Sequence, residues 1–233
     1  MVQRMIGKVP SGFSGHSAPV GEARPRRVMH VLRDAAKRVF DMAVSFILII
    51  LALPLFLVVG AIVAMDGGPV FFRHKRVGRG GELFGCWKFR TMIVDAEACL
   101  GEYLALHPEA AEEWRHDQKL SFDPRVTPVG RFLRGTSLDE LPQLFNVLLG
   151  DMSLVGPRPV TKGEMAHYGD VAALYTIVRP GITGLWQVSG RNDIGYRERV
   201  ALDKRYILNH HLLFDFIILY RTIGVVLSRR GAR

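Results

Sequence analysis

Two adjacent carboxylates, Asp139 and Glu140, stand in the segment TSLDELPQL of a chain that is otherwise basic, with a formal net charge of +9. One interpretation of the pair is structural. Ser137 and Glu140 fit the S-x-x-E capping box of a helix N-terminus, in which the Glu side chain only bonds the backbone. Pro142 weakens this interpretation, because a helix that began at Ser137 would lose an internal hydrogen bond there. A later helix start leaves Glu140 available for chemistry.

The chemistry open to this pair follows from its place near a helix N-terminus. The helix dipole stabilises anions there, so we expect both carboxylates to be ionised. Adjacent helical side chains point about 100° apart, which prevents them from performing one shared task. The pair therefore suits two tasks: one carboxylate attacks phosphorus, and the other holds a cation.

Six cationic side chains could surround such a site. Several stand beside glycine or proline, an unusual place for an arginine that only improves solubility. Guanidinium groups match phosphate oxygens bidentately. Taken singly, each cation is more often a surface charge or part of an ion pair, but with the acid pair they indicate a phosphate-handling site. The six are Lys88 and Arg90 in KFRTM, Arg131 and Arg134 in GRFLR, Arg158 in GPRP and Arg191 in SGRN.

The composition narrows the class of partner. A positive balance implies an anionic partner, such as nucleic acid, acidic lipid headgroups or a phosphorylated metabolite. The aromatic residues belong mostly to apolar segments, which argues against nucleic acid. The two cysteines, Cys86 and Cys99, have no C-x-x-C spacing, so a reduced setting is expected, without a disulfide framework or a zinc cluster. The sequence contains no P-loop, no Rossmann fingerprint and no Asp-x-Asp metal motif.

Residues 42–65 carry no charge, and roughly 20 apolar residues are enough to cross a bilayer as a helix. Pro54 lies in the middle of this stretch, where it removes a backbone hydrogen bond and kinks a helix. Basic clusters flank both ends, and the positive-inside rule disfavours moving either cluster across a membrane. A hairpin that breaks at Pro54 and returns to the same face satisfies both clusters. A single kinked span and a buried helix of a soluble core are the alternatives.

The remaining pattern is that of a small domain of helices with one hairpin. Residues 1–30 show no hydrophobic periodicity and are expected to form a disordered basic arm. The glycines of GRGG at 78–81, between two aromatic-bearing segments, predict a β-hairpin. Gly150 suits a helix C-cap, and the apolar part of the last helix should lie on a surface. Helices are expected at 97–106, 109–118, in the second half of 123–136, at 144–150, near 162–176 and over 196–228.

Long motifs follow one another in a recognisable order: KRVFDM before the apolar stretch, GPVFFRHKRVGRGG, KFRTM, DPRVTPVGRFLRGTSLDELPQLFNVLLGDMSLVGPRP and RPGITGLWQVSGRN. Over about residues 36–228 the chain resembles the monotopic polyprenyl-phosphate phosphoglycosyl transferases, a bacterial sugar transferase family. More narrowly, it resembles the short exopolysaccharide-initiating hexose-1-phosphate transferases. The resemblance implies an α+β, mainly helical fold with a membrane-embedded re-entrant helix broken at Pro54 (31–66). A catalytic domain (67–233) would follow, with a β-hairpin and interfacial amphipathic helices, on the cytoplasmic face of the bacterial inner membrane.

The resemblance also implies an activity: transfer of a hexose-1-phosphate, galactose or glucose, from a UDP-sugar to undecaprenyl phosphate with release of UMP. Asp139 would be the nucleophile that forms a covalent phosphosugar intermediate, and Glu140 a ligand of Mg²⁺. Lys88, Arg134, Arg158 and Arg191 match the family's basic positions around the substrate phosphates. The product would initiate exopolysaccharide or another surface polysaccharide. The donor, the lipid acceptor and membrane lipids are the expected partners, without nucleic acid, and a homodimer is left open.

Two alternative functions are weighed against this hypothesis, and the sequence differs from the family pattern at two positions. A membrane-tethered scaffolding protein would use the basic surface to bind anionic lipid or a partner enzyme, but would not need the acid pair. A metal-dependent hydrolase of nucleotide sugars would release free sugar phosphate without a lipid acceptor.

The family often has Ser-Pro at the helix break, where this chain has Leu53-Pro54. Gly135 follows Arg134 where another basic residue is common, which is expected to loosen the loop before the acid pair.

Overall fold

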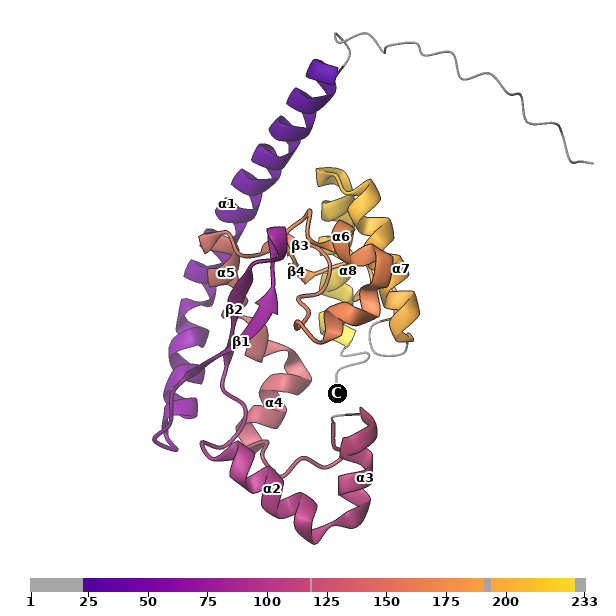
Figure 1. Ribbon diagram of the computed structural model, residues 1–233. Helices are drawn as coiled ribbons and strands as arrows, with labels where there is room; N and C mark the ends of the chain where they lie inside the picture. Colours follow the sequence, from indigo (N-terminus) through magenta and orange to yellow (C-terminus); the bar gives the residue numbers. More distant parts are fainter. Residues whose placement is uncertain (1–22, 118, 191–193, 229–233) are drawn as a thin grey trace, which may run out of the picture.

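The computed structural model describes residues 23–117, 119–190 and 194–228 (Figure 1). A long helix lies along one side of the molecule, the hairpin and α5 pack beside it, and α7 and α8 lie on the opposite side (Figure 1). The α-helices are α1 (Ala23–Ala64), α2 (Ala96–Leu106), α3 (Pro108–Asp117), α4 (Pro128–Thr136), α5 (Gln143–Leu149), α6 (Ala172–Tyr175), α7 (Tyr196–Asn209) and α8 (Leu212–Ser228). Short 3₁₀ segments are η1 (Arg79–Gly81), η2 (Leu138–Glu140) and η3 (Glu164–Val171), and the strands are β1 (Phe71–Val77), β2 (Leu83–Phe89), β3 (Ser153–Val155) and β4 (Gly181–Thr183). The expected mainly helical α+β class is confirmed.

The apolar stretch forms part of α1, which continues as one helix with Pro54 inside it. We expected two helices separated by a break, but a proline can kink a helix without ending it. The helix already begins at Ala23, within the range expected to be the disordered arm; residues 1–22 of that arm lie outside the described residues. Among the described residues, Leu32–Ala64 is the one stretch long and apolar enough to cross a membrane, and only 17% of its most apolar window is buried. The return of the chain to the same membrane face stays a prediction.

The predicted hairpin is confirmed. Strands β1 and β2 pair antiparallel, with Phe71 opposite Phe89 and Val77 opposite Leu83. The turn between them uses Gly80 and Gly81 at φ +74° and +83°, a left-handed conformation that suits glycine. The pairing places Lys88 and Phe89 on β2, which packs against α5 and the turn η2, and the other KFRTM residues, 90–92, follow the strand.

The second half of the chain departs from the predicted helices in two places. The region near 162–176 forms the 3₁₀ segment η3 and the short α6, because Gly169 adopts a non-helical conformation at φ +49°. The last helical region is divided into α7 and α8 by His210, whose backbone is extended. His211 then caps α8, since its Nδ1 accepts the backbone N–H of Phe214 at 3.1 Å. Helix α8 presents apolar side chains outward, as expected for a surface helix: Leu213, Phe216, Tyr220 and Ile223.

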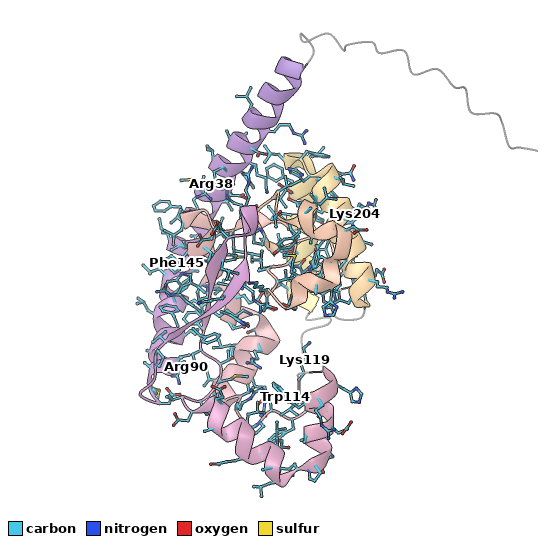
Figure 2. The ribbon with its side chains drawn as sticks, in the orientation of Figure 1. Arg38, Arg90, Trp114, Lys119, Phe145 and Lys204 are labelled. Atoms are coloured by element: carbon cyan, nitrogen blue, oxygen red, sulfur yellow. The ribbon has the colours of Figure 1, made fainter. Side chains whose placement is uncertain are left out.

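Two basic residues of the KRVFDM motif fasten α1 to the rest of the molecule. Arg38 donates to the backbone carbonyls of Val147 and Leu148, in the last turn of α5 (Figure 2). Lys37 forms an ion pair of 2.7 Å with the buried Asp215 of α8. Because α5 directly follows the acid pair, the position of α1 and that of the acid pair are coupled.

The largest buried cluster lies between α5, the parallel pair β3–β4, α7 and α8. Its members are nearly all aliphatic or aromatic, and α1 and the hairpin pack against its edge. The turn after α5 is completed by Gly150, which caps the helix at φ +102° as predicted. The buried members include Leu144, Val147, Met152, Val155, Leu185, Tyr206 and Ile218.

Helix α4 offers a matched pair of glycines for testing this packing. A methyl group on Gly130 would lie 2.0 Å from the backbone oxygen of Thr91, whereas one on Gly135 would meet nothing within 4 Å. We expect Gly130→Ala to lower the free energy of unfolding by about 1–3 kcal/mol through overpacking. Gly135→Ala should instead raise it by up to about 1 kcal/mol, because alanine favours the helix. Thermal unfolding in detergent measures both, and equal melting temperatures would contradict the contact between α4 and Thr91.

Candidate active site

The acid pair lies in the short turn η2, between the end of α4 and the start of α5. Ser137 ends α4 in a left-handed conformation, at φ +58°, and its side chain makes no N-cap hydrogen bond to η2. The capping-box interpretation of Ser137 and Glu140 is therefore wrong. Helix α5 begins only after Pro142, which satisfies the fixed φ of proline at a position where no intrahelical donor is needed.

Lys88 of β2 contacts both carboxylates. Its Nζ lies 2.6 Å from Glu140 Oε1 and 3.5 Å from Asp139 Oδ2. The two acids differ in exposure, because Asp139 is buried whereas the Glu140 side chain is 37% exposed. One carboxylate is thus enclosed by protein and the other is open to a ligand, which agrees with two separate tasks.

The charges of this group are interdependent. Burial raises the pKa of Asp139, and the neighbouring Glu140 adds to the rise, while Lys88 and Arg134 oppose it. We expected the helix dipole to favour the ionised form, but α5 begins after Pro142 and desolvation has the larger effect. Burial also disfavours the charge of Lys88, yet the two carboxylates outweigh it and raise the pKa of Lys88. Lys88 is therefore the cation that allows an anionic Asp139 at this depth.

Arg134 lies close to the acid pair. Its Nε donates to the hydroxyl of Thr91 at 2.9 Å. Burial lowers the pKa of Arg134, and the charge of Asp139 acts in the opposite direction. The structure thus brings two of the predicted cations together, because Lys88 and Arg134 both act on Asp139.

Arg158 belongs to a second group of cations near the same strand. Its guanidinium lies 5.4 Å from the ring centre of the buried Trp186, and that of Arg199 lies 4.8 Å from the same centre. The buried thiol of Cys86, two residues before Lys88, feels the charges of Lys88, Glu140 and Arg158, which places Arg158 in the same electrostatic neighbourhood. The backbone carbonyl of Arg158 accepts a hydrogen bond of 3.0 Å from Tyr175.

The other predicted cations have different positions. Arg90 binds Asp66 and the backbone oxygen of Val63, so it fastens the end of α1 rather than the site (Figure 2). Arg131 is exposed, with its guanidinium 6.0 Å from the ring centre of Phe122. Arg191 lies outside the described residues.

Sequence reasoning missed Arg76 and Arg199. Arg76, in the basic run RHKRVGRGG, pairs with Glu164 at 2.8 Å and acts on Cys86 together with Lys88. Arg199 has no glycine or proline beside it, so the signal that identified Arg158 could not identify Arg199.

The acid pair fits a magnesium ion that arrives with a phosphorylated ligand. In the described part of the chain, no group of three His, Cys, Asp or Glu side chains is close enough to hold a metal ion alone. Mg²⁺ is commonly bound by one or two carboxylates, with substrate phosphates and water as its other ligands. The partly exposed Glu140 offers such a carboxylate, and Lys88 currently neutralises it.

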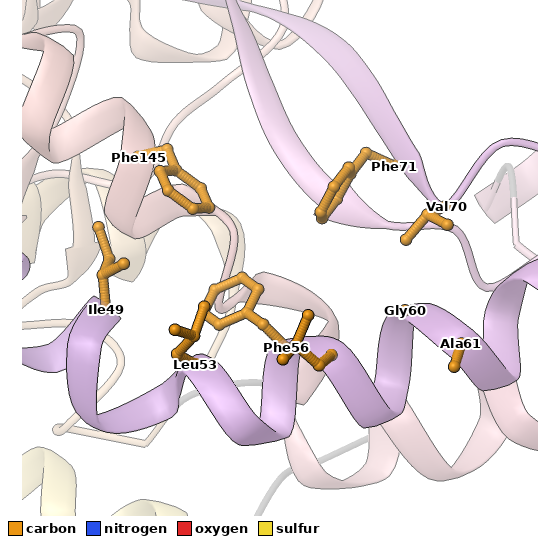
Figure 3. A pocket seen from close by; sticks show the side chains of 9 residues that line it. Ile49, Leu53, Phe56, Gly60, Ala61, Val70, Phe71 and Phe145 are labelled. Atoms are coloured by element: carbon orange, nitrogen blue, oxygen red, sulfur yellow. The ribbon is translucent and has the colours of Figure 1, made fainter.

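An apolar cavity of about 410 Å³ lies between α1, the base of the hairpin and α5. The rings of Phe56, Phe71 and Phe145 face this space from three elements (Figure 3). Phe71 also packs edge-to-face on Trp87, the neighbour of Lys88, with the ring centres 5.8 Å apart. The cavity therefore extends from the exposed apolar face of α1 toward the strand that carries Lys88.

Comparisons with known proteins give consistent results. Residues 32–229 match the family described as bacterial sugar transferase. The chain is 53% identical over 196 residues to an undecaprenyl-phosphate galactose phosphotransferase of Salmonella typhimurium; the matched region covers 84% of this chain and 41% of that protein. It is 49% identical over 198 residues to the exopolysaccharide production protein ExoY of Rhizobium meliloti, and this match covers 84% of this chain and 88% of that protein. It is 38% identical over 196 residues to a UDP-glucose:undecaprenyl-phosphate glucose-1-phosphate transferase of Klebsiella pneumoniae, and this match covers 80% of this chain and 39% of that protein. The chain thus spans less than half of two of these proteins and most of ExoY.

The raised pKa of Asp139 leads to a prediction about stability. A carboxyl group whose pKa is raised by folding binds protons more readily in the folded chain, so stability falls as pH rises through that range. Asn resembles the protonated form, and we expect Asp139→Asn to raise the melting temperature at pH 7 by roughly 2–4 °C. The gain should be smaller when the pH is lowered to 4, because protonation of the wild-type carboxylate increases as the pH falls. Thermal unfolding at both pH values measures it, with the exposed Asp170→Asn as the control. A lower melting temperature for Asp139→Asn at pH 7 would contradict the desolvation of this carboxylate.

Proposed function

This chain belongs to the bacterial sugar transferase family, and from that premise we propose that it transfers a hexose-1-phosphate from a UDP-sugar to undecaprenyl phosphate, with release of UMP. The observation that carries the proposal is the buried Asp139, held beside a lysine and next to a more exposed acid. A solvated carboxylate would be a weak nucleophile, and burial strengthens its interactions with neighbouring charges. Binding of anionic lipid alone does not require a buried acid pair.

Two displacements at one phosphorus complete the proposed reaction. An oxygen of Asp139 attacks the β-phosphorus of the donor, and the bond from that phosphorus to the bridging oxygen breaks. UMP leaves as an anion with the electron pair of that bond, so no proton is needed. A phosphate oxygen of the lipid then attacks the same phosphorus, and the carboxylate of Asp139 leaves. The mixed anhydride of the intermediate is reactive enough for the second step.

The cations of the site would neutralise the donor before Asp139 attacks. Two anions repel each other, and charge stabilisation is the main contribution of proteins to phosphoryl transfer. Lys88 holds Asp139 in place, and Arg134 and Arg158 would bind phosphate oxygens. Glu140 would hold Mg²⁺, which would supply positive charge to offset that of the diphosphate. Arg191 is proposed for the same phosphate-binding role on the family resemblance alone.

The apolar parts of the molecule suit a lipid acceptor. Many large apolar side chains of α1 are exposed, among them Phe46, Ile50, Leu51, Leu57 and Val58. Exposure of this kind is unfavourable in water and favourable in a bilayer. We infer that α1 is embedded in the inner membrane from the cytoplasmic face. The chain would enter from that face, bend at Pro54 and return to the same face. The cavity beside α1 would then receive part of the acceptor's chain, near the strand of Lys88.

The sugar is proposed from the relatives' names. Galactose appears in the name of the Salmonella protein, at 53% identity, and glucose in that of the Klebsiella protein, at 38% identity. We therefore propose galactose-1-phosphate first and glucose-1-phosphate second, for the initiation of an exopolysaccharide. A panel of UDP-sugars, assayed for UMP release with undecaprenyl phosphate and Mg²⁺, would choose between them.

Asp139→Asn tests the nucleophile directly. We expect it to lower UMP release by at least about 10⁴-fold, because the amide cannot form the covalent intermediate. The variant should still bind membranes, since its apolar surface is unchanged. Asp170→Asn, on the exposed face of η3, should keep full activity. Incubation with UDP-galactose labelled in the sugar, without acceptor, should label the wild-type chain but not the variant.

Three results would change this assignment. Appreciable turnover by Asp139→Asn would remove Asp139 from the role of nucleophile. Release of free sugar phosphate without acceptor would favour a hydrolase. Membrane binding with no UMP release from any UDP-sugar would favour the scaffolding alternative.

A further inference from the structure

The proposed reaction leaves open the role of one polar residue of the KFRTM segment, Thr91. Thr91 follows β2 and is buried, 8% exposed. Its backbone oxygen accepts the N–H of Thr127 at 3.1 Å, which joins the end of β2 to the start of α4. Gly130 packs so closely on the same oxygen that a methyl group there would lie 2.0 Å away. Thr91 is therefore fixed against the first turn of α4.

The Thr91 hydroxyl reaches one turn further along α4 to Arg134. It accepts a hydrogen bond of 2.9 Å from Nε of Arg134. Nε is the root of the guanidinium group, so this bond sets the plane and direction of the fork. A guanidinium carries five N–H groups, and the four on the terminal nitrogens stay available. In the described part of the chain, no other residue accepts a side-chain hydrogen bond from Arg134.

Arg134 stands in the last turn of α4, and the turn η2 with the acid pair follows directly after Ser137. Asp139 and Arg134 influence each other's charge in both directions, which requires proximity. Asp123 and Arg125 are the other charged groups that act on Arg134, and they pair with each other at 2.7 Å. Arg134 therefore belongs to the group of charges around Asp139, with its Nε held by Thr91.

We propose that Thr91 is a positioning residue, which fixes Nε of Arg134 and thereby presents its terminal nitrogens to the β-phosphoryl oxygens that Asp139 attacks. The inference rests on the proposed function, because it assumes a nucleoside diphosphate sugar as the ligand. Thr91 itself does not touch the donor. It acts through Arg134, whose bidentate geometry matches two oxygens of one phosphoryl group. KFRTM then places both cations of the acid pair, Lys88 directly and Arg134 through Thr91.

Two substitutions of Thr91 separate the hydroxyl from the packing. Thr91→Val keeps the shape and removes the acceptor, and we expect kcat/KM for the UDP-sugar to fall by about tenfold or more, the typical effect of losing a hydrogen bond to a charged group. Thr91→Ser keeps the hydroxyl, and its kcat/KM should stay within about threefold of the wild type. Melting temperatures are measured in parallel, so that a loss of folded protein is not read as a loss of activity.

A double-mutant cycle with Arg134→Gln decides whether Thr91 acts through the arginine. In that background we expect Thr91→Val to have no further effect on kcat/KM, because the group that it positions is absent. An equal additional loss in the Arg134→Gln background would overturn the proposal. Failure of Thr91→Ser to retain activity, with an unchanged melting temperature, would also overturn it.

Calorimetric binding of UDP with Mg²⁺ distinguishes failure of this inference from failure of the proposed reaction. If no UDP-sugar is turned over but UDP binds more weakly to Thr91→Val than to Thr91→Ser, the positioning role stands and the reaction does not. If turnover occurs and the two variants behave alike, the reaction stands and the positioning role falls. A wild-type chain that neither turns over a UDP-sugar nor binds UDP overturns both.

Discussion

The contact of Lys88 with Asp139 and Glu140 is the interaction on which the rest of the site depends. Two adjacent carboxylates, one of them buried, repel each other and lose hydration, and a single ammonium group offsets both effects. The position of the Lys88 ammonium group requires β2 to run beside the turn η2, so the hairpin and α5 must be packed against each other. The β-hairpin therefore has a function beyond closing the domain, because it delivers the charge that stabilises the buried Asp139.

The acid pair lies in a short 3₁₀ turn. Neighbouring side chains diverge by about 120° in such a turn, so the two carboxylates have different surroundings although Lys88 contacts both. Ser137, at φ +58°, ends α4 and allows the short 3₁₀ turn before Pro142. This turn places Asp139 inward and Glu140 outward, so that one acid is protected from water while the other is accessible from the solvent.

The apolar helix α1 and the candidate site are connected through side chains. Arg38 binds the carbonyls that end α5, and Lys37 reaches the buried Asp215 of α8. Arg90 fastens the other end of α1 through Asp66. With both ends of the apolar stretch attached to the rest of the molecule, the depth of α1 in a bilayer would determine how far the acid pair lies from the lipid headgroups.

The sequence by itself determined the acid pair, the apolar stretch, the glycine turn of the hairpin and the C-cap at Gly150. These depend on local rules, namely spacing, charge and the φ angles that glycine and proline allow. Only the tertiary structure decided that Lys88 contacts both acids, that burial raises the pKa of Asp139, and that Arg90 serves α1 while Arg134 serves the site. Those features depend on which distant segments pack together and how much water they exclude, and no local pattern encodes either quantity.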